Sequence, residues 1–424
     1  MKIEKVSARQ VFDSRGNPTV EAEVTTKDAI GRAAVPSGAS TGIHEACELR
    51  DGGKRYFGKG VSKAVNNINT KINKRLKGLR IEDHRIIDEA MLELDNSREK
   101  KNLGANAILA VSMACARAAA VHYNMYLYEY IGELYSNKKF VLPIPFANLI
   151  NGGVHAGNKL DFQEFMVVPI KAKSFSEASM ILSEIYHELK HILEQSYGKE
   201  ATNVGDEGGF APPLESAEEA LDLLEVAATE AGYINKVGFA FDAAASEFYD
   251  KKTKTYSLNK KKYSEDELVD YYVKLKKQHK KIISIEDPFD QDSFSGFKKL
   301  TKKLGKTVQI VGDDLTVSNV GRIMHAIKQK MCNALLLKVN QIGSITQALE
   351  AAHLAHNNGW NVTVSHRSGE TEDPFIADLA VGIACGQIKL GAPARGERTA
   401  KYNQLLRIEE WLGKKAIYAK FKLS

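Results

Sequence analysis

Six residues that could do chemistry each close a short apolar run, such as GFAFD, SIE or ALLLK. They are three carboxylates, two lysines and a histidine: Asp242, Glu286, Asp313, Lys338, His366 and Lys389. Most stretches between them carry the apolar spacing of a helix. This alternation is typical of a (βα) barrel, in which side chains at the carboxyl ends of the strands converge on one face. The pattern therefore predicts a cation site beside titratable groups.

The three carboxylates are the predicted metal ligands. Asp242, Glu286 and Asp313 come from three different predicted strands, and buried together they would repel one another. A divalent cation removes this conflict, and ligation by oxygen alone favours Mg²⁺, with Mn²⁺ as a substitute. The alternative is that each acid caps a helix or pairs with a lysine. Three acids in succession, followed by strand-end lysines, favour the metal.

Lys338 is a candidate general base. It follows the apolar run ALLL and is expected in a largely enclosed barrel mouth near Lys389. Desolvation and the nearby positive charge would lower the pKa of its amine towards neutrality, whereas the ligand carboxylates oppose this shift. The alternative is a lysine that only pairs with those acids.

Glu207 is a candidate general acid. It lies in DEGGF, where the glycines let the backbone approach a ligand closely, and burial would raise the pKa of its carboxyl group. His155 and His366 lie in glycine-containing loops, which suits polar binding better than core packing. Arg367 and Ser368 follow His366 and could donate hydrogen bonds to a phosphate.

The elements that position these residues fall into two parts. Residues 1–139 are predicted to form an α+β domain, because strand patterns are followed by helix patterns, and residues 140–424 are predicted to form the barrel. The expected strands of the first part span 3–13 and 19–26, with 33–36 continuing the sheet. Its expected helices span 60–76, 86–94 and 106–130.

The barrel is expected to begin with an antiparallel hairpin. The strands 144–150 and 165–169 are separated by only about a dozen glycine-rich residues, too few for a crossover helix. Glu164 therefore lies at the same end as the later strand tips. Two helices, 177–197 and 216–232, follow on either side of the loop that carries Glu207.

Composition limits the class of protein and its compartment. The chain has 424 residues, a net charge of +6, and ordinary hydrophobic and charged fractions of 43% and 26%. Four scattered cysteines without a CxxC pair favour a reducing, cytoplasmic location, and the first residues lack the apolar region of a signal peptide. The longest apolar stretch, 105–121, is rich in alanine and contains Arg117, so a packed helix is expected there and no membrane span.

Lysines are concentrated between Lys251 and Lys281, which raises the question of a nucleic-acid surface. A solvated helix face is favoured, because Leu268, Tyr272 and Leu275 form the opposite face and no aromatic residues are interleaved for base stacking. No nucleic-acid partner is expected.

Ten segments of this chain resemble the signature segments of the enolase family. They occur in family order across essentially the whole chain: VPSGASTGIHE, NGGVHAGN, QEFMVVP, GDEGGFAP, FDAAASEF, SIEDPF, GDDLTV, LKVNQIGS, SHRSGETED and AKYNQLLRIEE. The resemblance implies an α/β fold, with an N-terminal α+β domain and a C-terminal TIM-like barrel of ββαα(βα)₆ order. It also implies a glycolytic and gluconeogenic lyase that interconverts 2-phospho-D-glycerate with phosphoenolpyruvate and water.

The same resemblance implies roles for individual residues. Lys338 matches the base that removes the proton beside the substrate carboxylate, and Glu207 matches the acid that helps the hydroxyl group leave. The supporting and substrate-binding positions are His155, Glu164, His366, Arg367, Ser368 and Lys389. Asp242, Glu286 and Asp313 match the ligands of a first Mg²⁺, and Ser40 matches a ligand of a second that arrives with the substrate. The segment around Ser40 is expected to be a mobile lid.

Two alternatives remain open at this point. One is another enzyme of the same superfamily, such as an acid-sugar dehydratase or racemase, that shares the three metal ligands. The other is an interaction protein with an enolase-like surface. The resemblance also implies a homo-oligomer, either a dimer or an octamer, while a further cell-surface or secreted pool and secondary macromolecular partners stay open.

Overall fold

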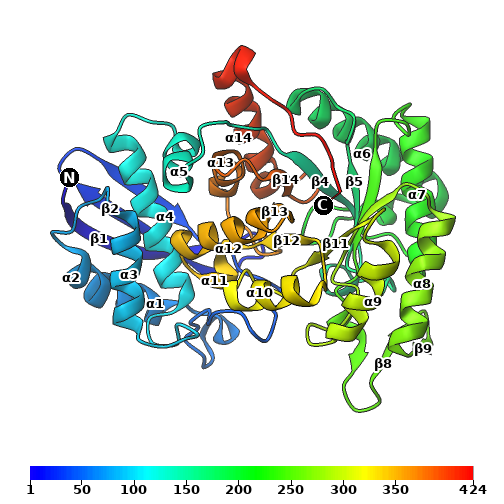
Figure 1. Cartoon of the computed structure of the whole chain (residues 1–424), viewed down its shortest axis with the longest axis horizontal. Helices are drawn as coiled ribbons and strands as arrows, with labels where there is room; N and C mark the ends of the chain where they lie inside the picture. Colours follow the sequence, from blue (N-terminus) through cyan, green and yellow to red (C-terminus); the bar gives the residue numbers. More distant parts are fainter. Residues whose placement is uncertain (424) are drawn as a thin grey trace.

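A computed structural model describes residues 1–423, which form a small sheet with helices beside a barrel (Figure 1). The sheet contains β1 (Ile3–Phe12), β2 (Pro18–Thr26) and β3 (Ile30–Ala34), all antiparallel and in that order. The first two strands were predicted to within a residue or two. The third begins earlier than expected, at Ile30, because a tight turn at residues 27–29 returns the chain directly from β2.

Five helices complete this first part. They are α1 (Ser62–Asn67), α2 (Asn73–Leu76), α3 (His84–Asp95), α4 (Ala105–His122) and α5 (Leu127–Tyr135), with a π-helical turn at Ile68–Ile72 joining α1 to α2. The expectation of one helix over 106–130 is wrong. Asn124 takes the left-handed conformation, with φ at 53°, and ends α4 before α5 begins. Asparagine tolerates this conformation better than most residues, so the break has a local cause.

Helix α4 is packed inside this part of the molecule, as expected. Among residues 1–423 it is the helix that is long and apolar enough to cross a membrane, by length and composition alone. However, 83% of that stretch is buried inside the structure. It contacts β2, β3, α3 and α5, and its many alanines allow close approach to the sheet.

The larger part is a closed barrel of eight strands. They are β4 (Ile144–Asn151), β5 (Glu164–Val168), β6 (Gly238–Asp242), β10 (Ile282–Glu286), β11 (Gln309–Gly312), β12 (Ala334–Leu337), β13 (Asn361–Ser365) and β14 (Gly386–Lys389). Strand β5 is antiparallel to both of its neighbours, and all other pairs are parallel. The predicted opening hairpin is confirmed.

Helices surround the barrel in the predicted ββαα(βα)₆ order. They are α6 (Phe175–Tyr197), α7 (Ala217–Glu230), α8 (Glu265–Gln278), α9 (Phe294–Leu304), α10 (Val320–Gln329), α11 (Val339–Ile342), α12 (Ile345–Asn357), α13 (Phe375–Gly382) and α14 (Gly396–Leu412). Serine side chains accept the backbone N–H at the first turn of α6, α7, α8 and α12, which helps to set where each helix begins. A small sheet of β7 (Tyr249–Asp250), β8 (Thr255–Leu258) and β9 (Lys261–Tyr263) is inserted before α8.

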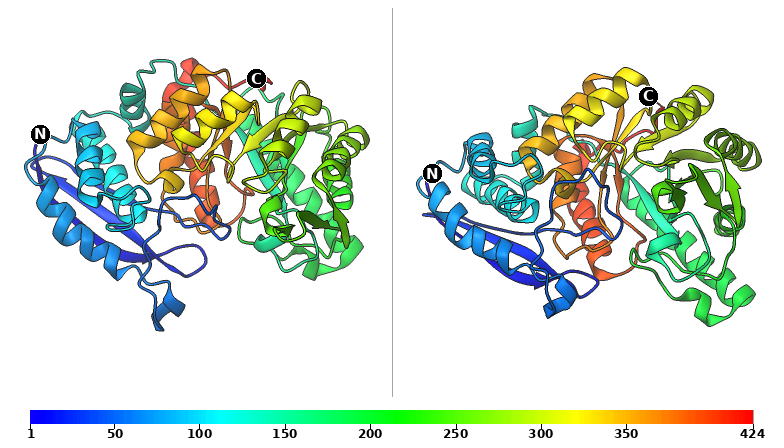
Figure 2. Two further views of the ribbon diagram at one scale, coloured as in Figure 1. Left: turned by 60° about the horizontal axis from the view of Figure 1, so that its bottom comes forward. Right: turned by 90° about the horizontal axis from the view of Figure 1, so that it is seen from below.

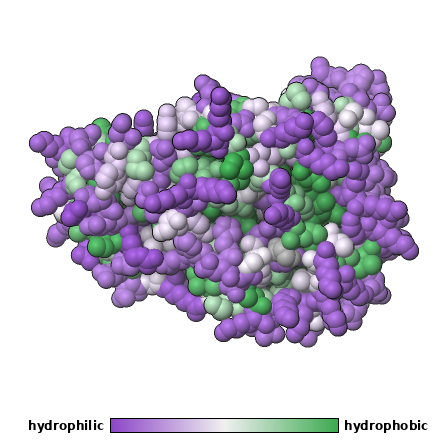
Figure 3. Space-filling model, turned by 45° about the horizontal axis from the view of Figure 1, so that its top comes forward, coloured by the Kyte–Doolittle hydropathy of each residue, from purple (hydrophilic) through white to green (hydrophobic). Residues whose placement is uncertain are grey.

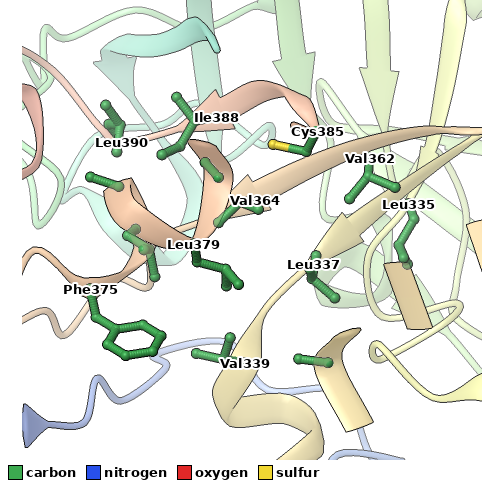
Figure 4. Close-up of a cluster of buried hydrophobic side chains, with 14 of the residues drawn as sticks. Leu335, Leu337, Val339, Val362, Val364, Phe375, Leu379, Cys385, Ile388 and Leu390 are labelled. Carbon is green, nitrogen blue, oxygen red and sulfur yellow. The ribbon is translucent and has the colours of Figure 1, made fainter. Parts of the chain in front are cut away.

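Alternation along the last strands separates an apolar outer face from an inner face that is still apolar in β12, at Ala334 and Leu336, and is polar in β13 and β14. Leu335, Leu337, Val362 and Val364 pack with residues of α13 on the outer face (Figure 4). Their neighbours in sequence therefore face the barrel interior, because successive side chains of a strand point to opposite sides. This alternation places Lys389, which follows Ile388, on the inner face.

The surface is mostly hydrophilic on the face that Figure 3 displays, with several hydrophobic patches between charged residues. The lysine-rich region belongs to β8, β9 and α8. Leu268, Tyr272 and Leu275 of α8 are buried, as predicted for a helix whose lysines form its solvated face.

Candidate active site

Three carboxylates on adjacent strands lie at one end of the barrel. Glu164 of β5 and Glu286 of β10 both pair in register with Asp242 of β6. The ammonium group of Lys389 lies among them, with Nζ 2.9 Å from Glu164 Oε2, 2.9 Å from Glu286 Oε1 and 3.6 Å from Asp242 Oδ2. Burial lowers the pKa of Lys389, but these carboxylates outweigh it and raise that pKa well above its usual value.

Asp313 and Lys338 form a second buried ion pair beside this group. Asp313 accepts from Lys338 Nζ through one carboxylate oxygen and from Gln341 Nε2, at 2.8 Å, through the other. Burial lowers the pKa of Lys338, but the charge of Asp313 outweighs burial and raises it. The prediction of a lowered lysine pKa is therefore wrong for this arrangement, because the neighbouring carboxylate opposes burial more strongly than expected.

The chemistry of the predicted donors suits a divalent cation, although within residues 1–423 the carboxylate oxygens of Asp242, Glu286 and Asp313 do not form a group within 4.8 Å of one another. Asp242, Glu286 and Asp313 are buried carboxylates at one end of the barrel, and in this structure their charge is balanced by lysine ammonium groups. Oxygen donors of this kind suit Mg²⁺. Carboxylate oxygens of Asp287, Asp313 and Asp314 also lie within 4.8 Å of one another. Asp287 accepts the backbone N–H groups of Asp313 and Asp314, so it orients this turn.

Glu207 lies between two buried histidines. Its Oε1 is 3.5 Å from His155 Nδ1 and 3.5 Å from His366 Nε2, and its Oε2 accepts from Asn148 Nδ2 at 2.9 Å. Burial raises the pKa of Glu207, but His366, His155 and Arg398 outweigh it and hold that pKa well below its usual value. The expected raised pKa is wrong here.

Glu164 shows the opposite shift. Burial and the neighbouring charge of Glu207 raise its pKa well above the usual value, although Lys389 opposes this. The environment thus shifts the pKa values of these two carboxyl groups in opposite directions, with that of Glu164 raised and that of Glu207 lowered.

Arg398 is a buried residue of this region that the sequence analysis missed. It is fully buried on α14, and its Nη1 donates to His366 Nδ1 at 2.7 Å and to the backbone oxygen of Arg367 at 2.6 Å. A guanidinium group has no acceptor, so Nδ1 of His366 must accept. Burial lowers the pKa of His366 well below its usual value, although the charge of Glu207, 3.5 Å from Nε2, opposes this.

The segment after β3 reaches across the open end of the barrel (Figure 2). The backbone N–H of Ala39 donates to Ser368 Oγ at 2.6 Å, and Arg367 Nη2 donates to the backbone oxygen of Ser40 at 3.1 Å. Arg367 also contacts Glu45 Oε1 at 3.0 Å. The cavity beneath is only about 10 Å³, so this segment nearly closes the site.

Most of the predicted site residues line this one cavity. They are Ser40, His155, Glu164, Glu207, Lys338, His366, Arg367, Ser368 and Lys389, joined by Gln163 and Ser365. The three predicted metal ligands contact its lysines. Besides Arg398, the sequence analysis missed Glu45 and Gln341, although both stand inside segments that resemble a family signature. Their role depends on contacts with Arg367 and Asp313, which no local pattern reveals.

Comparisons with known proteins agree over the whole chain. Residues 139–424 match the family model described as enolase, C-terminal TIM barrel domain, and residues 3–131 match enolase, N-terminal domain. A curated relative from Solanum lycopersicum named enolase is 55% identical over 432 residues, covering 98% of this chain and 97% of that protein. An enolase from Thermococcus gammatolerans is 55% identical over 419 residues, covering 98% of this chain and 96% of its own length.

Proposed function

The chain belongs to the enolase family, and from this premise we propose which residues carry out the family's reaction. The activity is that of a phosphopyruvate hydratase, a lyase of glycolysis that interconverts 2-phospho-D-glycerate with phosphoenolpyruvate and water. The observation that carries this assignment is 55% identity along nearly the full length.

Lys338 is the base in our proposal. It removes the proton from C2 of 2-phosphoglycerate, the carbon beside the carboxylate. Its position supports this role, because only 11% of its side chain is exposed and it lines the cavity that Arg367 and Ser368 also line. In the structure the amine is held protonated by Asp313, so the role requires Asp313 to take another partner during the reaction.

Glu207 is the acid that gives a proton to the departing hydroxyl group at C3, which leaves as water. Its ionised state in the free chain does not prevent this, because an anionic substrate beside it raises its pKa. We propose that this proton comes from Glu164. Side-chain atoms of Glu164, His155 and Glu207 lie within 4.8 Å of one another, and the pKa of Glu164 is already raised. The electron pair released at C2 forms the double bond to C3 as the hydroxyl leaves.

The remaining polar residues bind and orient the substrate. We propose that Arg367 and Ser368 hold its phosphate, and that His155, Glu164, His366 and Lys389 surround its hydroxyl and carboxylate groups. Asp242, Glu286 and Asp313 would hold one Mg²⁺, and Ser40 a second that arrives with the substrate. Bound there, these cations supply positive charge that stabilises the negative charge developing on the substrate carboxylate.

The organisation of the protein follows from the same proposal. Residues 1–139 form a capping domain that supplies the Ser40 segment, and residues 140–424 form the catalytic barrel. We propose a homo-oligomer, a dimer or an octamer, in the cytoplasm, with no nucleic-acid partner.

A spectroscopic assay tests the assignment directly. Purified protein is mixed with 2-phosphoglycerate, with and without Mg²⁺, and the absorbance of phosphoenolpyruvate is followed. We expect turnover only in the presence of Mg²⁺, and a metal-replete sample without turnover contradicts the assignment. Acid sugars serve as control substrates, because turnover of these alone would favour the superfamily alternative.

A further inference from the structure

A second cavity lies outside the active site, at the seam between the two parts of the chain. It has a volume of about 510 Å³ and is lined by residues from several segments, among them Glu45, Lys100, Arg322 and Gln341. Cavities of roughly 300–1,000 Å³ are the size that holds small organic molecules. Nothing in the reaction described above uses this space.

Lys100 is the unusual residue of this cavity. Its side chain is buried, with 3% of the residue exposed, yet its ammonium group has no hydrogen-bond or ion-pair partner within residues 1–423. Its aliphatic stem passes close to Gly343, where a Cβ would lie only 3.0 Å from Cδ. Burial lowers the pKa of Lys100, and Asp95 opposes this only from beyond contact distance.

Two other buried lysines provide a contrast. Lys389 and Lys401 each contact a carboxylate directly, the second with Nζ 2.8 Å from Glu370 Oε2. The ammonium of Lys100 has no such partner among the residues that the structure describes. It is not among the fully buried polar atoms that lack a hydrogen bond, so it reaches the accessible space of the cavity.

Other groups around the cavity also favour an anion. Arg98 is exposed at its edge with no ion pair in the described part of the chain. The lining acids are already engaged, since Glu45 pairs with Arg367 and Glu99 lies 3.5 Å from Lys101. The cavity thus offers cationic donors, whereas its acidic groups have partners elsewhere.

We propose that this cavity binds a small organic anion, whose phosphate or carboxylate group pairs with the ammonium of Lys100. Charge-assisted hydrogen bonds of this kind are short and strong, and the bound group would supply the acceptor that Lys100 lacks. The remaining space accommodates the body of a molecule of metabolite size.

The site lies next to the segment that closes the active site. The backbone N–H of Cys47 donates to the oxygen of Glu99 at 2.7 Å, and that of Ala46 donates to the oxygen of Gln341 at 2.9 Å. An anion at Lys100 therefore borders segments that also hold Glu45 and Gln341.

Equilibrium dialysis with radiolabelled inorganic phosphate, and separately with malonate, tests the proposal. The active site also binds anions, so four proteins are compared: the unaltered chain, Lys100→Met, Ser368→Ala and the double variant. We expect Lys100→Met to weaken the affinity of one class of sites for the anion by about tenfold or more, equivalent to about 1.4 kcal/mol. Ser368 lines only the active-site cavity, so Ser368→Ala should leave that class intact and weaken the other, and the double variant should weaken both. Tighter binding of phosphate or of malonate identifies which anionic group the site prefers.

Two controls separate binding from folding. Lys77→Met removes an exposed lysine that does not line the cavity and should leave both classes unchanged, while Lys100→Arg should retain binding. In the unaltered protein, phosphate should slow amide hydrogen exchange in residues 92–104 and 341–347. If Lys100→Met binds anions as Lys77→Met does, or if phosphate leaves exchange in both segments unchanged, the proposal is wrong.

Discussion

At the scale of single residues, direct neighbours determine the charge states of the active site. Burial alone would lower the pKa of Lys338 and raise that of Glu207, and both are shifted the other way. Lys338 contacts Asp313, and Glu207 lies 3.5 Å from each of two histidine rings. At such distances the interaction between charges in a poorly solvated site exceeds the penalty of burial.

The roles of these two residues predict different defects. Lys338→Ala should abolish dehydration and also the exchange of the C2 proton with solvent, because no other group removes that proton. Glu207→Gln should lower the rate of dehydration by about 10²–10⁴-fold, the usual contribution of a general acid. Exchange of the C2 proton with solvent should remain measurable in this variant. Nuclear magnetic resonance of substrate in deuterated water, with Mg²⁺ present, measures both. Loss of exchange in Glu207→Gln with exchange retained in Lys338→Ala would reverse the assignment.

At the scale of elements, the segment between β3 and α1 completes the site. Ser37 pairs with Gly369 through two backbone hydrogen bonds of 2.7 and 2.8 Å, while Ala39 and Ser40 contact Ser368 and Arg367. These contacts use the groups that are proposed to bind the substrate phosphate. The segment must therefore exchange partners when substrate binds.

Hydrogen exchange should detect this rearrangement. Exchange across residues 36–44 is expected to slow only when substrate and Mg²⁺ are both present, because the two together order the segment. Ser40→Ala should shift the Mg²⁺ dependence of the rate with little effect on folding. Thr41→Ala, which alters a neighbour without a proposed ligand role, serves as the control. Equal exchange in free and fully liganded protein would contradict the lid.

Helix α13 carries a buried acid with a consequence for stability. Asp378 accepts from Gln404 Nε2 at 3.1 and 3.3 Å. Burial raises its pKa to about 7, although Arg117 and Gln404 oppose this. The folded chain keeps the proton up to about pH 7, whereas the unfolded chain releases it near the usual aspartate pKa of 3.8. This contribution to stability is therefore complete below about pH 4 and is lost as the pH rises to about 7.

Asp378→Asn should remove that dependence. Above pH 7 the free energy of unfolding of the variant is expected to exceed that of the unaltered chain by at most about 4 kcal/mol. At pH 4 the two free energies should differ little. Urea unfolding at pH 4, 6 and 8 measures the difference. Asp266→Asn on the exposed face of α8 is the matched control. A difference that does not change with pH would show that Asp378 is ionised in the folded chain.

At the scale of the whole molecule, the two parts are joined by contacts that also shape the site. Arg117 of α4 pairs with Asp373 just before α13, with Nη2 2.6 Å from Oδ1, and Asp373 also accepts the backbone N–H of Ala34 in β3. The N-terminal sheet is thus bonded to the barrel beside the loop that carries Arg367 and Ser368. The barrel alone lacks the Ser40 segment that closes the cavity.

Assembly is the property of the whole molecule that remains a prediction. Sedimentation equilibrium should give a mass of twice or eight times the chain mass of 46.8 kDa, because the enolase family forms dimers and octamers. The measurement should be repeated at several protein concentrations, since a dimer dissociates on dilution. A mass of one chain at all concentrations would contradict the proposed homo-oligomer.

The sequence by itself determined the elements, the barrel order and the residues that meet at its open end. Apolar spacing distinguishes helices from strands, and the short glycine-rich connection before Glu164 leaves room only for a hairpin. The single helix expected over 106–130 failed because a left-handed residue, Asn124, interrupts an otherwise continuous helical pattern.

Only the tertiary structure decided which groups are partners, and therefore which are charged. Arg398 contacts His366 across 32 residues of chain, and Lys389 joins Glu164 to Glu286 across the barrel. The unpaired ammonium of Lys100 likewise depends on the packing of two distant segments. A pKa reflects every charge within a few ångströms, and those neighbours are brought together by folding and not by their order along the chain.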